Sequence, residues 1–247
     1  MQCVQLRLQK LAKILEDLGC NNLKILQETT GYKFTSDSVL LANFFKAKKG
    51  DRVVEFCSGS GVISILGTAK TSAEHFDCFE IQSELAQMCK ESVKINNLTN
   101  ITVHNTDLKN APEILKGQRI DVVVVNPPYY TNSSQSASEQ IDMATHERTI
   151  TLKDIATTSA KLLKHGGKLY MVHIAERFAE ICYELIKNNL QPKRVVFVRP
   201  TPNKKYSVVL IEATKGAKVG LKFDELLLAD EQGNPTEQIN QMYNNKK

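Results

Sequence analysis

The sequence predicts an α/β fold in which a mostly parallel sheet of seven strands carries helices on both faces and ends in an antiparallel C-terminal hairpin. Three observations lead to this prediction. Short apolar segments alternate with helical patterns from Arg52 onward. The segment 120–125, IDVVVV, is typical of a strand that is buried on both faces. The last two strand-like segments are joined by few residues, which favours a hairpin.

The composition is that of a globular chain of 247 residues, with 42% hydrophobic and 24% charged positions. This length suffices for one substantial core, and it excludes a disulfide mini-scaffold and a disordered tail. No apolar run approaches the roughly 18 residues that a membrane span needs. Residues 1–20 mix Gln, Arg, Lys and Glu with their leucines, unlike a signal peptide. We therefore expect a soluble, cytoplasmic protein.

The cysteines and the net charge constrain function only weakly. Six cysteines are scattered without a CxxC pair or a Cys/His cluster, so we expect reduced, mostly buried thiols and no metal site. The 32 basic and 27 acidic residues give a net charge of +5, a mild bias toward a polyanionic partner.

The first 48 residues are expected to form a helical segment ahead of the main domain. Residues 4–18 place leucines at helical spacing, which predicts an amphipathic helix that ends near Gly19. A Ser-Asp pair then stands where the N-cap of a second helix, over about 39–45, is expected.

The main domain, residues 49–225, is predicted to alternate between strands and helices. The strands are expected at 52–56, 75–80, 101–105, 120–125, 168–174, 194–199 and 206–213. The helices are expected at about 62–70, 83–96, 111–115, 152–164 and 176–188.

Glycine and polar runs punctuate the second half of the chain. The Gly166-Gly167 pair is expected to end the helix before it, and the polar stretch 131–140 is expected to be a loop. Residues 221–229 offer one more possible strand, and residues 226–247 are expected to form a polar tail that frays.

Glycine and acidic residues follow the first three predicted strands, at the sheet edge where ligands bind in such folds. The turn 57–61, CSGSG, exposes backbone N–H groups, although its spacing meets the dinucleotide fingerprint only in part. Glu80 ends the second strand, 19 residues after Gly61, where an acid accepts hydrogen bonds from ribose hydroxyls. Asp107 follows the third strand and could reach the exocyclic amine of an adenine. The alternative is that both acids are helix-cap or turn residues.

The fourth strand ends in the most specific motif, Asn126-Pro127-Pro128-Tyr129. The two prolines lock an extended turn and leave carbonyl groups facing outward. The side-chain oxygen of Asn126 and the carbonyl of Pro127 can then accept both protons of a planar amino group, and Tyr129 can stack on the ring that bears it. Such acceptors would stabilise positive charge that develops on the nitrogen. The alternative is a turn with merely structural prolines.

Together, EFCSGSG, Glu80, Asp107 and NPPY resemble the class I, S-adenosylmethionine-dependent methyltransferases of amino groups, which have a Rossmann-like fold. Longer segments resemble the bacterial tRNA methyltransferases that modify N6 of adenine 37 in valine tRNA. These segments are GYKFTSDSVLLA, FEIQSEL, NPPYY, the His146-Glu147 pair, LLKHGGKLYMVH, VVFVRP and VVLIEATKG. The resemblance spans about residues 23–223.

The resemblance implies S-adenosylmethionine as cofactor and tRNA as partner, and it assigns residues to the site. Cofactor contacts fall on Phe34, Ser36, Asp37, Glu55, Gly59, Gly61, Glu80, Ile81, Asp107, Leu108 and Asn126. Glu55 and the glycines would cradle the methionine part, Glu80 the ribose and Asp107 the adenine. The segment 1–48 would cover the cofactor, and Asn126, Pro127 and Tyr129 would be catalytic. No metal is implied.

Two departures from the family pattern lie in the first motif. The usual Asp is Glu55 here, and the usual first glycine is Cys57. Cys57 therefore requires a backbone angle that a side chain tolerates.

A basic stretch near the C-terminal hairpin is a candidate surface for RNA phosphates. Its cations, together with Arg148 and the stacking ring of Tyr129, form the predicted nucleic-acid contacts. They are Lys193, Arg194, Arg199, Lys204 and Lys205. The alternative is a strand edge that is protected by solvated charge.

The leading hypothesis is methylation of adenine N6 in a splayed-out tRNA anticodon loop by a monomeric enzyme. Within the same chemistry, the alternatives are methylation of a protein glutamine amide or of guanine N2 in ribosomal RNA. From other classes, the alternatives are a nicotinamide-dependent oxidoreductase, which leaves NPPY unexplained, and a noncatalytic nucleic-acid-binding protein.

Overall fold

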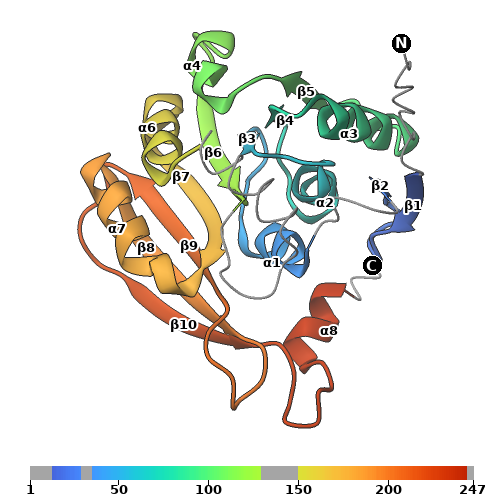
Figure 1. Cartoon of the computed structure of the whole chain (residues 1–247). Helices are drawn as coiled ribbons and strands as arrows, with labels where there is room; N and C mark the ends of the chain where they lie inside the picture. Colours follow the sequence, from blue (N-terminus) through green and yellow to red (C-terminus); the bar gives the residue numbers. More distant parts are fainter. Residues whose placement is uncertain (1–12, 29–34, 129–149, 244–247) are drawn as a thin grey trace, which may run out of the picture.

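A computed structural model describes residues 13–28, 35–128 and 150–243 (Figure 1). Their strands form an N-terminal sheet of two strands and a main sheet of eight, with the strand order β10-β8-β9-β7-β6-β3-β4-β5. The predicted sheet of seven strands is thus present, with an eighth strand at its edge.

The strands of the main sheet are as follows: β3 (Arg52–Phe56), β4 (His75–Glu80), β5 (Ile101–Asn105), β6 (Ile120–Val125), β7 (Leu163–Ile174), β8 (Leu190–Arg199), β9 (Val208–Lys215) and β10 (Lys222–Leu227). The first four have the bounds that the sequence predicts. Strands β3 to β7 run parallel, and β9 pairs antiparallel with both β7 and β8. The predicted C-terminal hairpin, β8 and β9, is confirmed, and β10 adds to β8 in parallel.

The helices cover both faces of the main sheet, as predicted (Figure 1). Those on one face are α1 (Ser36–Phe44), α2 (Val62–Lys70) and α3 (Ser83–Ile95). Those on the other are α4 (Ala111–Ile114), α6 (Leu152–Leu162) and α7 (Phe178–Lys187). Val122 and Val124 of β6 pack with the first group, and Val123 and Val125 pack with the second. This explains why the strand is apolar on both faces.

The helix predicted over residues 4–18 is wrong for its last part, because residues 13–17 form a strand. Strand β1 (Lys13–Asp17) pairs antiparallel with β2 (Lys24–Glu28). Between them, Gly19 and two asparagines take positive φ angles, which close a turn. The backbone N–H of Leu26 in β2 also donates to Ser92 Oγ of α3, 3.0 Å away. These hydrogen bonds favour a strand at residues 13–17 despite the helical spacing of the leucines. Residues 4–12 of the predicted helix lie outside the described ranges.

The prediction that Gly166 and Gly167 end a helix is also wrong. Helix α6 ends earlier, at Leu162, and both glycines lie within β7. Gly166 has a φ of 77°, and a Cβ on Gly167 would lie 2.9 Å from the carbonyl oxygen of Lys164. The pair therefore serves an irregular strand start, where the β6–β7 register shifts.

The C-terminal tail was predicted to fray, but its described part packs on the domain. Helix α8 (Glu237–Tyr243) buries Ile239, which is 9% exposed. Lys70 Nζ of α2 donates to the carbonyl of Met242 at 3.2 Å and to Asn43 Oδ1 of α1 at 2.9 Å. The polar composition of residues 226–247 hid these contacts. In the described ranges, no helix is both long and apolar enough to cross a membrane.

Candidate functional site

The glycine turn after β3 adopts the strained backbone that the sequence requires. Cys57, Gly59 and Gly61 have φ angles of 54°, 53° and 92°. Cys57, which stands where the family pattern has a glycine, therefore has a left-handed backbone angle, which a side chain adopts only at some energetic cost. The N–H of Ser58 donates to the carbonyl of Phe79 at 3.1 Å, and that of Gly61 donates to the carbonyl of Ser58 at 2.8 Å. These bonds fix the turn against β4.

Gly61 is also required by packing. It is the N-cap of α2, and a Cβ there would lie 2.5 Å from Cys89 Sγ of α3. The start of α2 therefore packs directly against α3 at Gly61, and only a residue without a side chain fits there.

Glu80 ties the turn to the second strand. Its side chain is buried, and Oε2 accepts the N–H of Gly59 at 2.9 Å while Oε1 accepts the N–H of Gln82 at 2.9 Å. Asn105 donates to the backbone carbonyls of Glu80 and Ile81, at 2.9 and 3.1 Å. A carboxylate oxygen can accept more than one hydrogen bond, so these two backbone contacts do not by themselves conflict with the predicted ribose contact.

Asp107 has the role that the alternative interpretation gave it, since it caps the short helix η1 (Leu108–Asn110). Its Oδ1 accepts the N–H of Lys109 at 2.8 Å, and Oδ2 lies 3.2 Å from Lys109 Nζ. Leu108 is buried beneath it. A capping carboxylate still has acceptor capacity, so the cap does not exclude a contact with an adenine amine.

Glu55 is enclosed by protein. It is 1% exposed, and its Oε2 accepts the N–H of Ser64 at 2.9 Å and the hydroxyl of the same residue. Burial raises its pKa to about 7, against the lowering effect of the Ser64 hydrogen bonds. These contacts anchor the first turn of α2, so Glu55 fixes the helix that follows the glycine turn.

The Asn126-Pro127-Pro128 turn lies next to the glycine turn. In the register of the parallel strands, Phe56 of β3 is opposite Val125 of β6 on one side and Phe79 of β4 on the other. The residues that follow these strand ends therefore lie side by side. Asn126 is half-buried, and its Nδ2 donates to Ser38 Oγ of α1 at 3.0 Å.

A cavity of about 190 Å³ adjoins the proline turn. It is lined by Pro127, Pro128, Ile150, Thr151, Leu152, Ile155, His173 and Arg177. Burial lowers the pKa of His173 to about 4, so its imidazole is neutral at pH 7. Arg177 forms a two-pronged ion pair with Glu180, at 2.7 and 2.8 Å. The cavity thus combines proline, leucine and isoleucine side chains with the polar groups of a threonine, a histidine and an arginine.

Several predicted site residues cannot be placed. Phe34, Tyr129 and Arg148 lie outside the described ranges, as does the His146-Glu147 pair. Ser36 is exposed and Asp37 is half-buried in the first turn of α1, close in sequence to the Ser38 contact.

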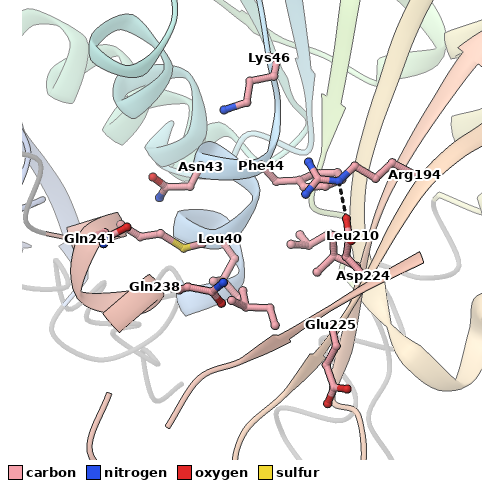
Figure 2. Close-up of a pocket in the computed structure, with 13 residues that line it drawn as sticks. Leu40, Asn43, Phe44, Lys46, Arg194, Leu210, Asp224, Glu225, Gln238 and Gln241 are labelled. Carbon is pink, nitrogen blue, oxygen red and sulfur yellow. Dashed lines mark hydrogen bonds and ion pairs between the residues drawn. The ribbon is translucent and has the colours of Figure 1, made fainter. Parts of the chain in front are cut away.

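Acidic partners for the basic stretch come from β10, a strand about 30 residues later. Arg194 donates to Asp224 at 3.0 Å and lies over the ring of Phe44, 5.1 Å from its centroid (Figure 2). Arg199 donates to Glu225 at 2.6 Å and stacks on a tyrosine ring. Lys193 Nζ donates to a backbone carbonyl at 3.1 Å, whereas Lys204 and Lys205 are exposed on the β8–β9 connection.

A second, larger cavity of about 560 Å³ lies between α1, α8 and strands β8 to β10. Figure 2 shows Lys46, Arg194, Asp224, Gln238 and Gln241 around it. None of the residues predicted to bind the cofactor lines this cavity. Arg194, predicted to contact RNA, does line it, and it is paired with Asp224 on the same wall.

The turn fits the methyl donor that the resemblance implies. Ser58 Oγ and Ser60 Oγ are buried and have no hydrogen-bond partner among the described residues. Such hydroxyls favour a polar ligand, because an unsatisfied buried group is costly. Neither serine was among the predicted site residues, although their positions next to the glycines of the turn were a signal. No sequence signal pointed to Ser38, because its contact with Asn126 joins residues that are 88 positions apart.

Known proteins are similar to this chain over most of its length. The model of one family, the methyltransferase small domain, matches residues 30–208. Two curated relatives are both named tRNA1(Val) (adenine(37)-N6)-methyltransferase. The one from Parabacteroides distasonis is 28% identical and covers 75% of this chain and 79% of the relative. The one from Trichodesmium erythraeum is 23% identical and covers 77% and 81%.

Solved structures share the fold. A predicted O-methyltransferase from Agrobacterium tumefaciens has a TM-score of 0.69 at 19% identity, over 84% of this chain and 95% of that one. The 16S rRNA N2 G1207 methyltransferase of T. thermophilus, in complex with AdoMet and guanosine, has a TM-score of 0.56 at 15% identity, over 83% and 50%.

Proposed function

The chain belongs to the methyltransferase small domain family, and we propose that it transfers the methyl group of S-adenosylmethionine to N6 of an adenine in tRNA. The observation that carries the proposal is the Asn126-Pro127 turn, which follows β6 directly beside the glycine turn of β3. The names of the two curated relatives support adenine 37 in the anticodon loop of valine tRNA as the target.

The glycine turn and Glu80 would hold the cofactor, which supplies an electrophilic methyl group when bound. Glu80 would accept hydrogen bonds from the ribose hydroxyls, and the buried hydroxyls of Ser58 and Ser60 would face polar groups of the cofactor. Asp107 would accept the adenine amine. Glu55 would act indirectly, because its carboxylate binds Ser64 of α2, the helix that follows the glycine turn.

The proline turn would orient the amine that is methylated. Asn126 Oδ1 and the carbonyl oxygen of Pro127 would each accept a hydrogen bond from one N–H of this amine. These two bonds would turn the lone pair of the nitrogen out of the plane of the ring. The same oxygens stabilise positive charge as the new bond forms. The methylated nitrogen then loses a proton to water, so this step requires no strong base.

The cavity beside the prolines would receive the flat face of the base. Its proline, leucine and isoleucine side chains suit a base that is no longer stacked in RNA, and the imidazole of His173, neutral at pH 7, adds no charge there. RNA bases in single-stranded loops are open to such capture. The remaining RNA contacts are proposed at Tyr129, Arg148, Lys193, Arg194, Arg199, Lys204 and Lys205. The two arginines would reach phosphates only by leaving their acidic partners.

The proposed setting follows from the substrate. We expect a monomer that acts in the cytoplasm, where tRNA is found. The domain that carries the activity is proposed to be residues 49–225, with residues 1–48 covering the cofactor and the C-terminal residues packed beside it.

Transfer of labelled methyl groups from S-adenosylmethionine tests the proposal. Unmodified valine tRNA is the substrate, and the same transcript with guanosine at position 37 is the matched control. The label is expected as N6-methyladenosine in the first transcript only. Label in ribosomal RNA as N2-methylguanosine, or in a protein glutamine, with none in tRNA, would overturn the proposed substrate.

A further inference from the structure

Helix α1 contacts the proposed amine-binding residue directly. Ser38 Oγ accepts a hydrogen bond from Asn126 Nδ2 at 3.0 Å, and Ser38 is 4% exposed. The two residues come from the segment before the first strand of the main sheet and from the end of its central strand β6. The contact therefore links the N-terminal segment to the site of the chemistry.

The direction of this hydrogen bond matters because a side-chain amide has two unlike ends. With Nδ2 facing Ser38, the carbonyl end Oδ1 is left to accept a proton from the substrate amine. Rotation of the amide by 180° would instead present an N–H group to another N–H group. An Asn126 free to rotate would spend part of its time in this unproductive orientation.

Helix α1 holds Ser38 in a fixed position. Leu40 and Leu41, in the next turn, are buried in the core. Phe44 and Phe45 pack edge-on against Tyr170 of β7, with ring centroids 5.7 and 6.2 Å apart. Because the helix is anchored in the core both next to Ser38 and at its C-terminal end, the Ser38 hydroxyl has a fixed position relative to the amide.

We propose that Ser38 is a positioning residue that holds the Asn126 amide with Oδ1 toward the substrate amine. The proposal rests on the proposed function, since it assigns Asn126 to the amine. It extends that function, because the N-terminal segment would then orient the Asn126 amide in addition to covering the cofactor.

Steady-state methyl transfer to tRNA by three variants tests the role. Ser38→Ala removes the hydroxyl, and Ser38→Thr keeps it. Ser159→Ala is the matched control, because Ser159 is also a buried helical serine and its hydroxyl has no hydrogen-bond partner among the described residues. We expect kcat to fall about tenfold in Ser38→Ala, with the KM for S-adenosylmethionine unchanged. Ser38→Thr should recover most of the loss, and Ser159→Ala should match the wild type.

Two kinetic results would overturn the proposal. One is a kcat for Ser38→Ala equal to that of Ser159→Ala. The other is a raised KM for S-adenosylmethionine with kcat unchanged, which would make Ser38 a cofactor contact instead.

The orientation can also be measured without any substrate. In the ¹⁵N-labelled protein, the side-chain amide signal of Asn126 is identified by its loss in Asn126→Ala. We expect this signal to shift and its protons to exchange faster with water in Ser38→Ala, but not in Ser159→Ala. An unchanged signal refutes the positioning role. A changed signal together with a wild type that methylates no tRNA refutes the substrate alone.

Discussion

The carboxylate of Glu80 accepts the backbone N–H of Gly59 at 2.9 Å, so the last residue of β4 holds the glycine turn that follows β3. The same carboxylate accepts the N–H of Gln82 with its other oxygen. One buried acid thus fixes the turn, and it is also the residue proposed to bind the ribose. Replacing it should affect the binding of the cofactor more than the fold.

Glu80→Gln tests this double role. The substitution replaces one acceptor oxygen with an NH₂ group, so either a backbone N–H or a ribose hydroxyl loses its partner. We expect the Kd for S-adenosylmethionine to rise by about tenfold or more, measured by calorimetry. Glu84→Gln in the first turn of α3 is the control and should bind like the wild type. Equal affinities in both variants would remove Glu80 from the cofactor site.

The buried carboxyl of Glu55 should make stability depend on pH. Its pKa is raised to about 7 in the folded protein, from 4.5, so the folded state holds the proton more tightly than the unfolded state. The stabilising effect is complete below pH 4.5 and is lost as pH rises through 7. Relative to Glu55→Gln, the free energy of unfolding of the wild type should fall by about 3 kcal/mol between pH 4.5 and 8. Urea unfolding at several pH values measures this difference, and a constant difference would contradict the prediction.

Gly61→Ala should be more costly than an alanine at another glycine with positive φ. At Gly61 the new Cβ would lie 2.5 Å from Cys89 Sγ, whereas at Gly117, whose φ is 78°, it would meet nothing within 4 Å. We expect Gly61→Ala to lower the free energy of unfolding by about 1 to 3 kcal/mol more than Gly117→Ala does. Denaturant unfolding of both variants measures the difference, and equal losses would show that packing against α3 adds nothing.

The exposed lysines and the paired arginines should differ in their effect on RNA binding. The Lys204→Ala/Lys205→Ala double variant removes two exposed cations, so the affinity for tRNA should fall several-fold and its dependence on salt should weaken. Arg194→Ala should weaken binding less, because its guanidinium is already paired with Asp224. Filter binding over a range of salt concentrations compares them. A larger loss for Arg194→Ala would mean that the ion pair opens to RNA.

Local sequence signals were sufficient for the centre of the fold. Strands β3 to β6 are short apolar runs between turn residues, and their predicted bounds match the structure. The hairpin of β1 and β2 was missed because the leucines of residues 4–18 happen to fit a helical period. That period did not reflect burial, since Leu15 is 48% exposed. Helix α8 was missed because it is mostly polar and buries chiefly Ile239.

The site was predictable where it follows a strand directly. Glu80 and Asn126 stand at the ends of β4 and β6, and parallel pairing brings such residues together. Contacts between distant segments gave no local signal. The pairing of Ser38 with Asn126, and of Arg194 with Asp224, depends on how helices and edge strands pack across the sheet.

The most direct test of the central claim compares turnover with cofactor affinity in Asn126→Ala. The account assigns Asn126 to the amine of the base, so kcat for methyl transfer to tRNA should fall by about 100-fold or more. The Kd for S-adenosylmethionine should stay within about threefold of the wild-type value. Losses of similar size in kcat and in cofactor affinity would contradict the assignment and make Asn126 chiefly a residue that holds the cofactor.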